Sequence, residues 1–475
     1  MAEMTRRDFL GAVAAIGPAA ALPRWLGAAP AERPNFIVIC TDDQGYGDLG
    51  CYGSKKLKTP NIDRMAAEGM RLTDFYVTAP VCTPTRSSLM TGCYPRRIGL
   101  HQHVLFPNST KGLNPSEITI AELLKPLGYA TACIGKWHLG YQKKFLPTSQ
   151  GFDDYFGIPF SNDMWLPPGM DYAPDAKLPP NFPDEVRKKG ERKRATVPLM
   201  RNDKVIEYPA VQATLTERYT AEAIRFIKAN KDKPFFIYLP HTMPHWPLHV
   251  SERFKGKSGA GLFGDVIMCI DWSVGQILST LKSLGLDRKT LVIYTSDNGP
   301  AAGSAGPLRG RKGTTWEGGM REPCIAWWPG KIPAGSVCSE LATIMDLLPT
   351  IAPLAGTKPP SDRVIDGKDI WPLLSGQPGA KSPYQAFFYH TARGQLAAVR
   401  SGKWKLHIVA PPQRRRRGQP ARQPLKPPLL YDLSSDIGET RNVAAEHPDV
   451  VKRLTALLKD FDAELRAHSR PVGRV

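Results

Sequence analysis

An eleven-residue run that begins with a cysteine has the residue types of a reactive site: Cys82-Thr83-Pro84-Thr85-Arg86-Ser87-Ser88-Leu89-Met90-Thr91-Gly92. Pro84 suits the first turn of a helix, where its missing N–H is not needed. Cys82 would then lie at or just before the helix N-terminus, where unpaired N–H groups and the helix dipole favour an anion. Arg86 follows one turn later and falls on the same face as Cys82. The run therefore predicts a nucleophile and a cation beside a bound anion. The alternative is a buried structural cysteine near a surface arginine.

Two pairs of oxygen-bearing side chains, Asp42-Asp43 and Asp297-Asn298, each follow an apolar run. Carboxylate and amide oxygens are ligands that suit a hard cation such as Ca²⁺ or Mg²⁺. Bringing these groups together without a cation would be unfavourable because like charges repel. A single pair of this kind usually marks a turn or a helix cap. Two pairs at two strand ends favour a metal site.

Lysine and histidine side chains supply the candidate cations, acid and base. Lys136 and His138 alternate on an extended segment between glycines, so both can face one side. His245 follows Pro244 and lies two residues before Pro247. His241 has a similar but poorer context and is a candidate to contact the catalytic residues rather than the substrate. Lys312 lies in a basic, glycine-rich loop. Taken singly, each of these residues has a structural alternative as a surface lysine or a half-buried histidine.

The elements that must position these residues are visible as continuous apolar runs. Runs at residues 36–40, 131–134, 235–239 and 291–295 indicate strands that are buried on both faces. Helical patterns at residues 59–69, around an apolar stripe from 215 to 227, and at 265–284 lie between them. This alternation predicts an α/β fold with a large mixed, mostly parallel sheet flanked by helices. The candidate site residues follow the carboxyl ends of the strands, where open α/β sheets bind ligands.

The chain of 475 residues divides into three predicted parts. Residues 1–31 form a signal peptide, residues 32–375 a catalytic domain, and residues 376–475 a C-terminal α+β subdomain with a small antiparallel sheet and a terminal helix. Short strands are expected at 387–390, 396–400, 404–408 and 429–433, and the helix at 450–465. The Pro/Arg-rich segment from Pro411 to Pro428 is predicted to be an exposed, solvated or disordered insertion rather than a dedicated binding site.

These motifs together resemble the type I sulfatase family, the formylglycine-dependent, arylsulfatase A-like enzymes of the alkaline phosphatase superfamily. The run from Cys82 resembles the family signature Cys-x-Pro-x-Arg with its following Thr-Gly, and residues 135–140 match the second signature, Gly-Lys-Trp-His-Leu-Gly. Residues 309–323 resemble the block Arg-Gly-x-Lys followed by Glu-Gly-Gly-x-Arg. The resemblance covers roughly residues 33–356. One departure is Cys93, because the family more often has arginine after Thr-Gly.

The resemblance implies an alkaline phosphatase-like fold and a sulfuric ester hydrolase. Cys82 would be oxidised to formylglycine by a formylglycine-generating enzyme. The family's metal is Ca²⁺, with Mg²⁺ as the alternative that sequence alone does not separate. The implied metal ligands are Asp42, Asp43, modified Cys82, Asp297 and Asn298. The implied catalytic residues are Cys82, Arg86, Lys136, His138, His245 and Lys312. The implied substrate-binding residues are Ser161, Lys136, His245 and Lys312.

The mechanism implied by the resemblance is hydrolysis of aryl or carbohydrate sulfate monoesters through a covalent sulfo-enzyme intermediate. The hydrated aldehyde at position 82 attacks sulfur, and His245, helped by Lys312, protonates the leaving oxygen. His138 then deprotonates the second hydroxyl, so that sulfate is expelled, while Arg86 holds the diol. Two other functions stay open: a phosphonate or phosphate ester hydrolase of the same superfamily, and a non-catalytic protein that binds sulfated glycans.

The amino terminus resembles a twin-arginine export signal. Arg6 and Arg7 precede an alanine-rich apolar stretch at residues 11–22, with a cleavage site expected at residues 29–31. This predicts export by the twin-arginine machinery to the periplasm or the extracellular space. The stretch is too short to span a membrane, and no transmembrane segment is expected.

Charge and cysteine content narrow the partners. The formal charge of +19 suits anionic substrates, and a sulfated small molecule or glycan is expected. No nucleic-acid-binding motif accompanies the charge, so nucleic acid is not expected. The eight cysteines show no CxxC spacing and imply no disulfide framework. The sequence does not specify the sulfate ester, exo or endo action on glycans, or the oligomeric state. The rim that selects the substrate is expected within residues 161–210 and the C-terminal subdomain.

Overall fold

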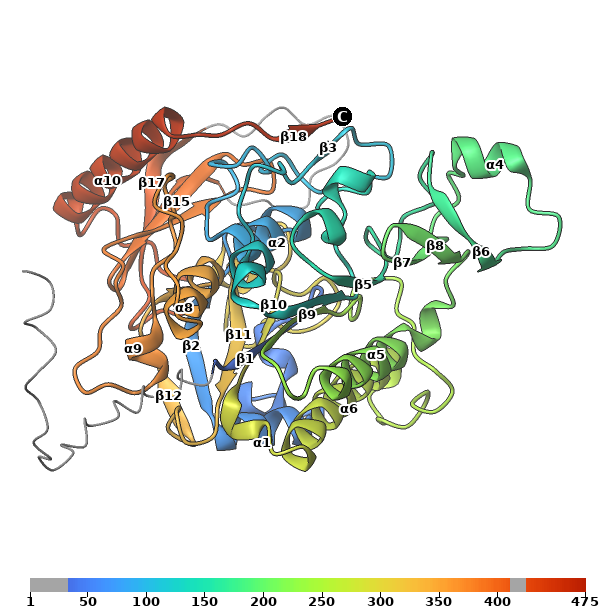
Figure 1. The fold of residues 1–475 in the computed structure, drawn as a ribbon. Coiled ribbons are helices and arrows are strands. Elements are labelled where there is room, and N and C mark those ends of the chain that lie inside the picture. The colour runs from blue at the N-terminus through green and yellow to red at the C-terminus, as the bar shows by residue number, and fades with distance from the viewer. Residues whose placement is uncertain (1–32, 411–423) are drawn as a thin grey trace, which may run out of the picture. The chain divides into compact units, whose positions relative to one another are not determined.

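The computed structural model describes residues 33–410 and 424–475, so the predicted export signal lies outside the described residues. The strands of this part of the chain form a large mixed sheet, a four-stranded antiparallel sheet and a two-stranded pair (Figure 1). In spatial order, the large sheet contains β12 (Ser336–Cys338), β2 (Met70–Tyr76), β11 (Arg321–Trp327), β10 (Thr290–Ser296), β1 (Asn35–Thr41), β9 (Phe235–Pro240), β4 (Ala130–Ile134), β5 (Asp154–Gly157), β7 (Leu199–Arg201), β8 (Lys204–Glu207) and β6 (Asp171–Lys177), with β13 (Ala342–Thr343) paired to β2.

The centre of the large sheet consists of the four strands that the apolar runs predicted. β10, β1, β9 and β4 are neighbours in that order, and each adjacent pair is parallel. Their carboxyl ends therefore meet at one edge of the sheet. β11 pairs with both β10 and β2 in the antiparallel sense, which makes the sheet mixed. The predicted fold class is confirmed.

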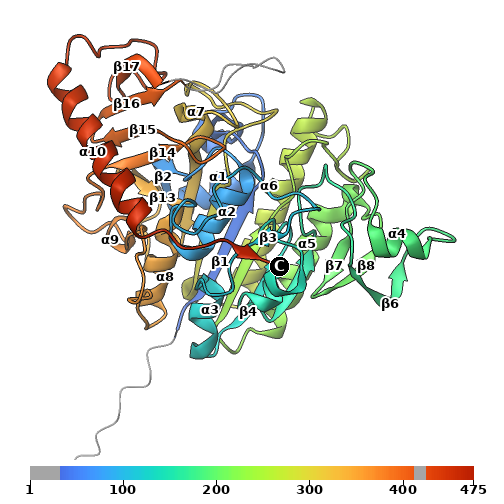
Figure 2. The same ribbon diagram turned by 90° about the horizontal axis from the view of Figure 1, so that it is seen from above.

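Both faces of the central strands are buried, which explains why their sequences are continuously apolar. Along β1, Phe36, Val38 and Cys40 pack into one hydrophobic layer, and Ile37 and Ile39 pack into the other. The first layer is covered by α2 (Cys82–Thr91), α3 (Ile120–Leu124) and α8 (Leu347–Leu354). The second is covered by α1 (Pro60–Glu68), α5 (Leu215–Ala229) and α6 (Gly261–Ser283), which lie together in the lower part of Figure 1, whereas α2 is nearer the viewer in Figure 2.

The long helices follow from their sequences. α1 has Thr59 as its N-cap residue and Pro60 as its first residue, as predicted. The predicted apolar stripe of α5 is buried along the whole helix. α6 begins four residues before its predicted start, and by length and composition alone it could cross a membrane. However, 67% of its most apolar window is buried inside the protein, as in the core helix of a globular domain.

The C-terminal part contains the expected small sheet and helix. β14 (Phe387–His390), β15 (Leu396–Ser401), β16 (Trp404–Val409) and β17 (Pro424–Asp432) pair in antiparallel order. α10 (Pro448–Ala467) packs on this sheet through Leu454 and Leu458. β17 includes residues 424–428, so the predicted insertion is shorter than Pro411–Pro428, because the strand already begins at Pro424, which pairs with Val409 of β16. The remaining strands and α-helices are β3 (Lys111–Gly112), which pairs with β18 (Gly473–Arg474), and the short helices α4 (Asp184–Lys189), α7 (Glu317–Met320) and α9 (Trp371–Leu374).

Candidate active site

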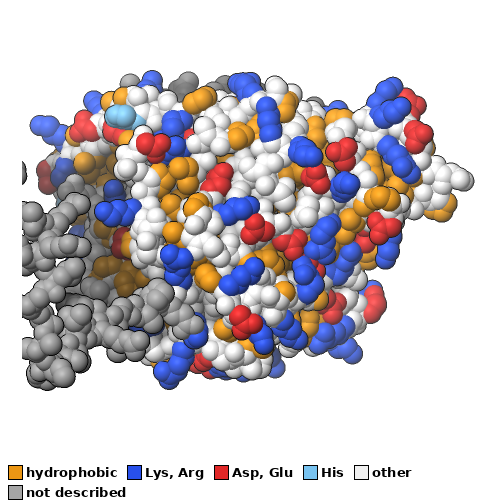
Figure 3. Space-filling view, viewed as in Figure 1, with side chains coloured by type: hydrophobic (Ala, Val, Ile, Leu, Met, Phe, Trp, Pro, Cys, Tyr) orange, Lys and Arg blue, Asp and Glu red, His pale blue; other side chains and the backbone are white. Residues whose placement is uncertain are grey.

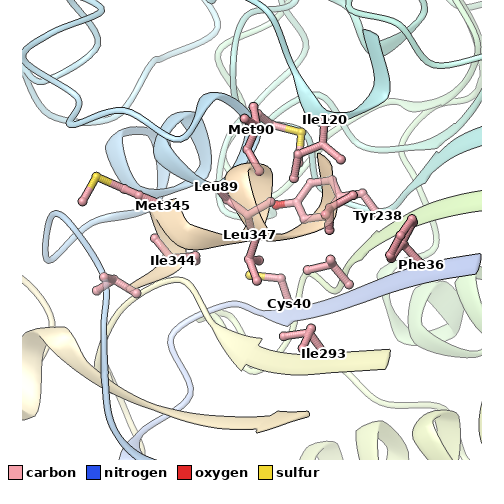
Figure 4. Packing of buried hydrophobic residues seen from close by; sticks show 14 of the residues in the cluster. Phe36, Cys40, Leu89, Met90, Ile120, Tyr238, Ile293, Ile344, Met345 and Leu347 are labelled. Carbon is pink, nitrogen blue, oxygen red and sulfur yellow. The ribbon is translucent and has the colours of Figure 1, made fainter. Parts of the chain in front are cut away.

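The helix that carries the signature cysteine is anchored in the core. α2 begins at Cys82 after an extended Val81, and every residue of the helix is buried. Leu89 and Met90 pack beside Cys40 of β1 and Leu347 of α8 (Figure 4). This packing holds the N-terminus of α2 at the carboxyl edge of the sheet.

The Cys82 side chain meets groups of both charges. Its Sγ lies 3.4 Å from Oδ1 of Asp42 and 3.9 Å from Nζ of Lys312. Burial, with the negative charges of Asp297 and Asp42, raises the pKa of the Cys82 thiol well above its usual value. The side chain therefore lies as a neutral thiol between a carboxylate and an ammonium group.

Arg86 reaches the same cluster from one turn further along α2. Its Nε and Nη2 lie 2.9 and 2.7 Å from Oδ2 of Asp297, and its Nη1 donates to the Lys136 carbonyl at 3.0 Å and to the Tyr238 hydroxyl at 3.3 Å. The side chain is completely buried. Such a paired, hydrogen-bonded guanidinium fixes the orientation of the Asp297 carboxylate.

The two acidic pairs converge from the ends of β1 and β10. The Asp43 amide donates to Oδ1 of Asp297 at 3.2 Å, and Nδ2 of Asn298 donates to Oδ1 of Asp43 at 2.7 Å. Ligand atoms of Asp42, Asp43, Cys82 and His245 all lie within 4.8 Å of one another.

The donor set at this point fits a hard divalent cation. Oδ1 of Asn298 is buried and has no hydrogen-bond partner within residues 33–410 and 424–475. An orphaned amide oxygen among converging carboxylates is what a cation with oxygen ligands requires. The residues that would hold the cation are those of the predicted set, with His245 also in reach.

Two lysines balance the charge of the acidic cluster. Lys136 Nζ lies 2.5 Å from Oδ2 of Asp42, and Lys312 Nζ lies 2.7 Å from the Asp43 carboxylate. Burial alone would raise the pKa of Asp42, but the surrounding positive charges, that of Lys136 foremost, hold it well below the usual value. Three carboxylates therefore face three cations, including Arg86. A divalent cation would make the site net positive and favourable for an anionic ester.

His138 is held in one tautomer. Its Nε2 lies 2.9 Å from the Leu105 carbonyl, which can only accept, so Nε2 carries the proton. Nδ1 is then an acceptor, and it is buried without a partner in the described part of the chain. Burial, reinforced by the charge of Lys136, lowers the pKa of His138 well below its usual value. His138 therefore has the properties of a neutral proton acceptor.

His245 lies at the more open side of the cluster. Its Nδ1 is 2.9 Å from Oδ1 of Asn162, and its Nε2 is 3.5 Å from Oδ2 of Asp43. The Ser161 hydroxyl lies within hydrogen-bond distance of both His245 and Lys136. Burial lowers the pKa of His245, although the charge of Asp43 opposes this shift. Ser161 thus bridges Lys136 and His245.

His241 lies elsewhere. It is completely buried, its Nε2 is 3.4 Å from the Ser273 hydroxyl of α6, and burial lowers its pKa to about 4. No contact joins it to the acidic cluster among the described residues. The expectation that His241 contacts the catalytic residues is therefore not supported, because its side chain points towards α6.

The loop that presents Lys312 is held by the C-terminal sheet. The Arg309 guanidinium donates to the Glu439 carbonyl at 2.6 Å, and the Glu317 amide donates to Oε2 of Glu439 at 2.7 Å, so both ends of the loop are tied to one residue. Lys405 of β16 donates to the Thr315 carbonyl at 3.0 Å.

The side chains of Lys405, Glu317 and Glu439 also form a buried ionic network. Lys405 Nζ lies 2.8 Å from Glu317 and 2.9 Å from Glu439, and none of the three side chains is exposed. His407 of β16 adds a contact to Glu439 at 2.9 Å. The C-terminal part therefore contributes directly to the position of a candidate active-site lysine.

Sequence reasoning missed several members of this arrangement. Asn162 directly follows Ser161, which the resemblance already implied as a substrate-binding residue, so its position next to His245 could have been suspected. Tyr238 was assigned only as part of a buried strand. Lys405 and Glu439 carried no motif, and only their complete burial in the fold marks them.

The fold and the site together define a class. A mixed sheet whose central parallel strands end at an acidic cluster, faced by a helix that begins with the signature cysteine, is the arrangement of an alkaline phosphatase-like sulfatase. The chain matches the Sulfatase family model over residues 34–357 and the model for the C-terminal region of aryl-sulfatase over residues 382–474. The chain belongs to the sulfatase family and is a sulfuric ester hydrolase.

Individual relatives agree with this assignment. The chain is 41% identical to arylsulfatase A of Homo sapiens, an alignment that covers 94% of this chain and 92% of the relative. It is 36% identical to steryl-sulfatase of Mus musculus, with 93% and 83% covered. Among solved structures, the PsFucS1 sulfatase from Pseudoalteromonas sp. superposes with a TM-score of 0.79 at 30% identity, covering 93% of this chain and 92% of that one.

Proposed function

We propose that this sulfatase hydrolyses aryl or carbohydrate sulfate monoesters with formylglycine, formed from Cys82, as its nucleophile. The observation that supports this most directly is the convergence on Cys82 Sγ of a carboxylate at 3.4 Å and an ammonium group at 3.9 Å, at the N-terminus of a buried helix. An anionic ester at this point meets the helix end and two lysines.

Formylglycine would supply a geminal diol, and a divalent cation, Ca²⁺ in our proposal, would supply a Lewis acid held by the oxygens of Asp42, Asp43, Asp297 and Asn298. Lys136 and Lys312 neutralise negative charge on the sulfuryl oxygens. Ser161, between Lys136 and His245, orients the ester oxygen.

Two histidines move the protons. His245 donates a proton to the leaving oxygen, with Asp43 at 3.5 Å to stabilise its protonated form. Nδ1 of His138, which already lacks a proton, accepts the one that must leave when sulfate is expelled. Arg86 keeps Asp297 and the Lys136 backbone, which follows β4, in place during both steps.

The first test is whether Cys82 is modified. Mass spectrometry of the peptide that contains Cys82, from protein made with a formylglycine-generating enzyme, should detect the aldehyde, and C82A should have no turnover. Only unmodified thiol in an active enzyme would contradict the proposal.

The proton donor is tested with leaving groups of different basicity. H245A should lose far more kcat/KM on an alkyl or sugar sulfate than on 4-nitrophenyl sulfate, because a nitrophenolate leaves without protonation. An equal loss on both substrates would remove His245 from this role.

A phosphonate or phosphate ester hydrolase is the second candidate. The phosphonate monoester hydrolase of Agrobacterium radiobacter superposes with a TM-score of 0.60 at 19% identity, which shows a shared fold alone. Matched assays on 4-nitrophenyl sulfate and phenylphosphonate esters separate the two functions, and faster turnover of the phosphonate would overturn the sulfatase proposal.

We also propose export by the twin-arginine route, supported by Arg6, Arg7 and the apolar stretch after them. Replacing both arginines with lysine should retain the protein in the cytoplasm, which cell fractionation measures. Undiminished export of that variant would contradict the route.

A further inference from the structure

A second cavity lies between the C-terminal helix and the loops next to the active site. It has a volume of about 480 Å³ and is lined by α10, the start of β15 and the segment around His101. A volume of this size accommodates a small ligand. Its floor is apolar, formed in part by Leu396, Ile408 and Leu458.

The rim of this cavity is strongly cationic. Arg96, Arg393, Lys459 and Arg466 face it, against one carboxylate, Asp462. That carboxylate is already shared by two of the arginines, at 2.8 Å from each. Arg393 and Lys459 have no acidic partner among the residues that the structure describes, so positive charge remains for a ligand.

The overall charge of the protein does not explain this cluster. Lysine and arginine side chains are spread over the face seen in Figure 3, with acidic side chains between them. Cations that are scattered in this way are the ordinary surface of a protein with a formal charge of +19. The cavity differs because four cations gather around a concave, partly apolar floor.

A short segment connects the cavity with the catalytic residues. His101 lines the cavity, and four residues later Leu105 accepts from His138 and donates to the Thr83 hydroxyl at 3.1 Å. Four residues span at most about 14 Å. Thr83 is the neighbour of Cys82, so the cavity edge lies within the reach of a few sugar units from the nucleophile.

The cationic side chains continue across this gap. The His103 amide donates to the Ala392 carbonyl at 2.9 Å, which places the Arg393 loop beside the segment. Burial lowers the pKa of His103, and the charges of Arg393 and Lys312 lower it further, so both cations act on the same ring. Arg393, which lines the cavity, and Lys312 of the active site therefore both lie near His103.

We propose that this cavity is a binding subsite for a further anionic sugar unit of a sulfated oligosaccharide, a few units along the chain from the sugar whose reacting sulfate ester lies at Cys82. The apolar floor suits a pyranose ring, and the rim suits its sulfate or carboxylate groups. This inference rests on the proposed function, and it names the substrate class as an anionic glycan chain rather than a small aryl sulfate.

The experiment measures binding separately from chemistry. End-labelled, heparin-derived disaccharide and hexasaccharide are titrated against C82A by fluorescence anisotropy at one ionic strength. In the C82A background, R393A and the K459A/R466A pair are compared with K228A, which removes an exposed cation from α5.

C82A should bind the hexasaccharide more tightly than the disaccharide. Each cation removed from the rim should weaken hexasaccharide binding about two- to five-fold, which is the loss expected for one exposed charge pair. K228A should change neither affinity.

Several outcomes would overturn the subsite. These are equal affinity for the two lengths, equal loss for both lengths in the rim variants, or single-stranded DNA binding with the same dependence on the rim. Turnover of 4-nitrophenyl sulfate by the Cys82 enzyme tests the proposed function independently. If turnover fails while the length-dependent binding persists, the subsite stands and the chemistry does not.

Discussion

Replacing Lys405 with methionine should disturb both the stability and the turnover of this enzyme. Lys405 is completely buried, and its ammonium group contacts Glu317, Glu439 and the Thr315 carbonyl at 2.8, 2.9 and 3.0 Å. Methionine keeps most of the side-chain volume but leaves two buried carboxylates without their shared cation. Removing one partner of such a network costs about 3–5 kcal/mol of unfolding free energy.

The sign of the electrostatic effect follows from Glu317. Burial alone would raise the pKa of Glu317, but the positive charges of Lys405, Arg321 and Arg400 outweigh it and hold the pKa well below the usual value. A lowered carboxyl pKa stabilises the folded state above the unfolded pKa, and this stability is lost as pH falls. K405M raises the Glu317 pKa, so the variant should lose stability at neutral pH and show a smaller further loss on acidification.

The kinetic effect of K405M should act through Lys312. Because Lys405 holds the loop that presents Lys312, its loss should lower kcat about 10- to 100-fold, the effect of a displacement of about 1 Å in a catalytic group. Urea unfolding and steady-state turnover of 4-nitrophenyl sulfate measure the two effects. K403M is the matched control, since Lys403 is half exposed and pairs with Asp432, a contact worth about 0–1 kcal/mol.

A double-mutant cycle separates positioning from general damage. In a K312A background, K405M should cause almost no additional loss of kcat while it still costs stability. The reasoning is refuted if K405M is as stable as K403M, or if its effect on kcat is undiminished when Lys312 is absent.

Three further predictions concern the metal site, a buried histidine and a close backbone contact. Ca²⁺ added to chelator-treated protein should raise the unfolding free energy by about 2.7 kcal/mol at 100 times its dissociation constant. N298A should need a higher Ca²⁺ concentration for the same increase, and calorimetric midpoints that respond identically in both proteins would count against this ligand. Burial lowers the pKa of His241 to about 4, so as pH falls from 6.5 to 4 the unfolded chain gains a proton that the folded chain does not. Stability should fall by about 3 kcal/mol over this range. H241Q should flatten that slope in urea unfolding, whereas H468Q, at an exposed histidine, should not; equal slopes in all three proteins would refute the assignment. A Cβ at Gly157 would lie 1.8 Å from the Gly135 carbonyl oxygen, so G157A should destabilise the protein by about 1–3 kcal/mol or more. G438A is its control, because its nearest atom would be 3.5 Å away, and thermal midpoints that match between the two variants would contradict the overlap.

The sequence predicted the centre of the fold because its signals are local. Strands β1, β4, β9 and β10 are buried on both faces, so each is a continuous apolar run that is readable without its neighbours. The residues that follow these strands had to meet at one edge once the sheet was parallel. For the same reason, the turn chemistry of Thr59 and Pro60 was enough to place the start of α1.

Other features depend on contacts between distant parts of the chain. Glu439 ties down the Lys312 loop from more than 120 residues away, and the cationic cavity joins α10 to the segment around His101. The sequence placed His138 in the catalytic set and His241 in a poorer context, but only the fold shows that His138 contacts the Leu105 carbonyl whereas His241 contacts α6.

The sequence by itself determined the family, the central strands and the chemical types at the nucleophile, since these depend on residue identity and short-range pattern. Only the tertiary structure decided which nitrogen of His138 accepts a proton, how the C-terminal sheet holds Lys312, and where surplus positive charge borders the active site. The physical reason is that hydrogen-bond geometry and burial are properties of pairs of groups, and the partners here come from separate elements of the fold.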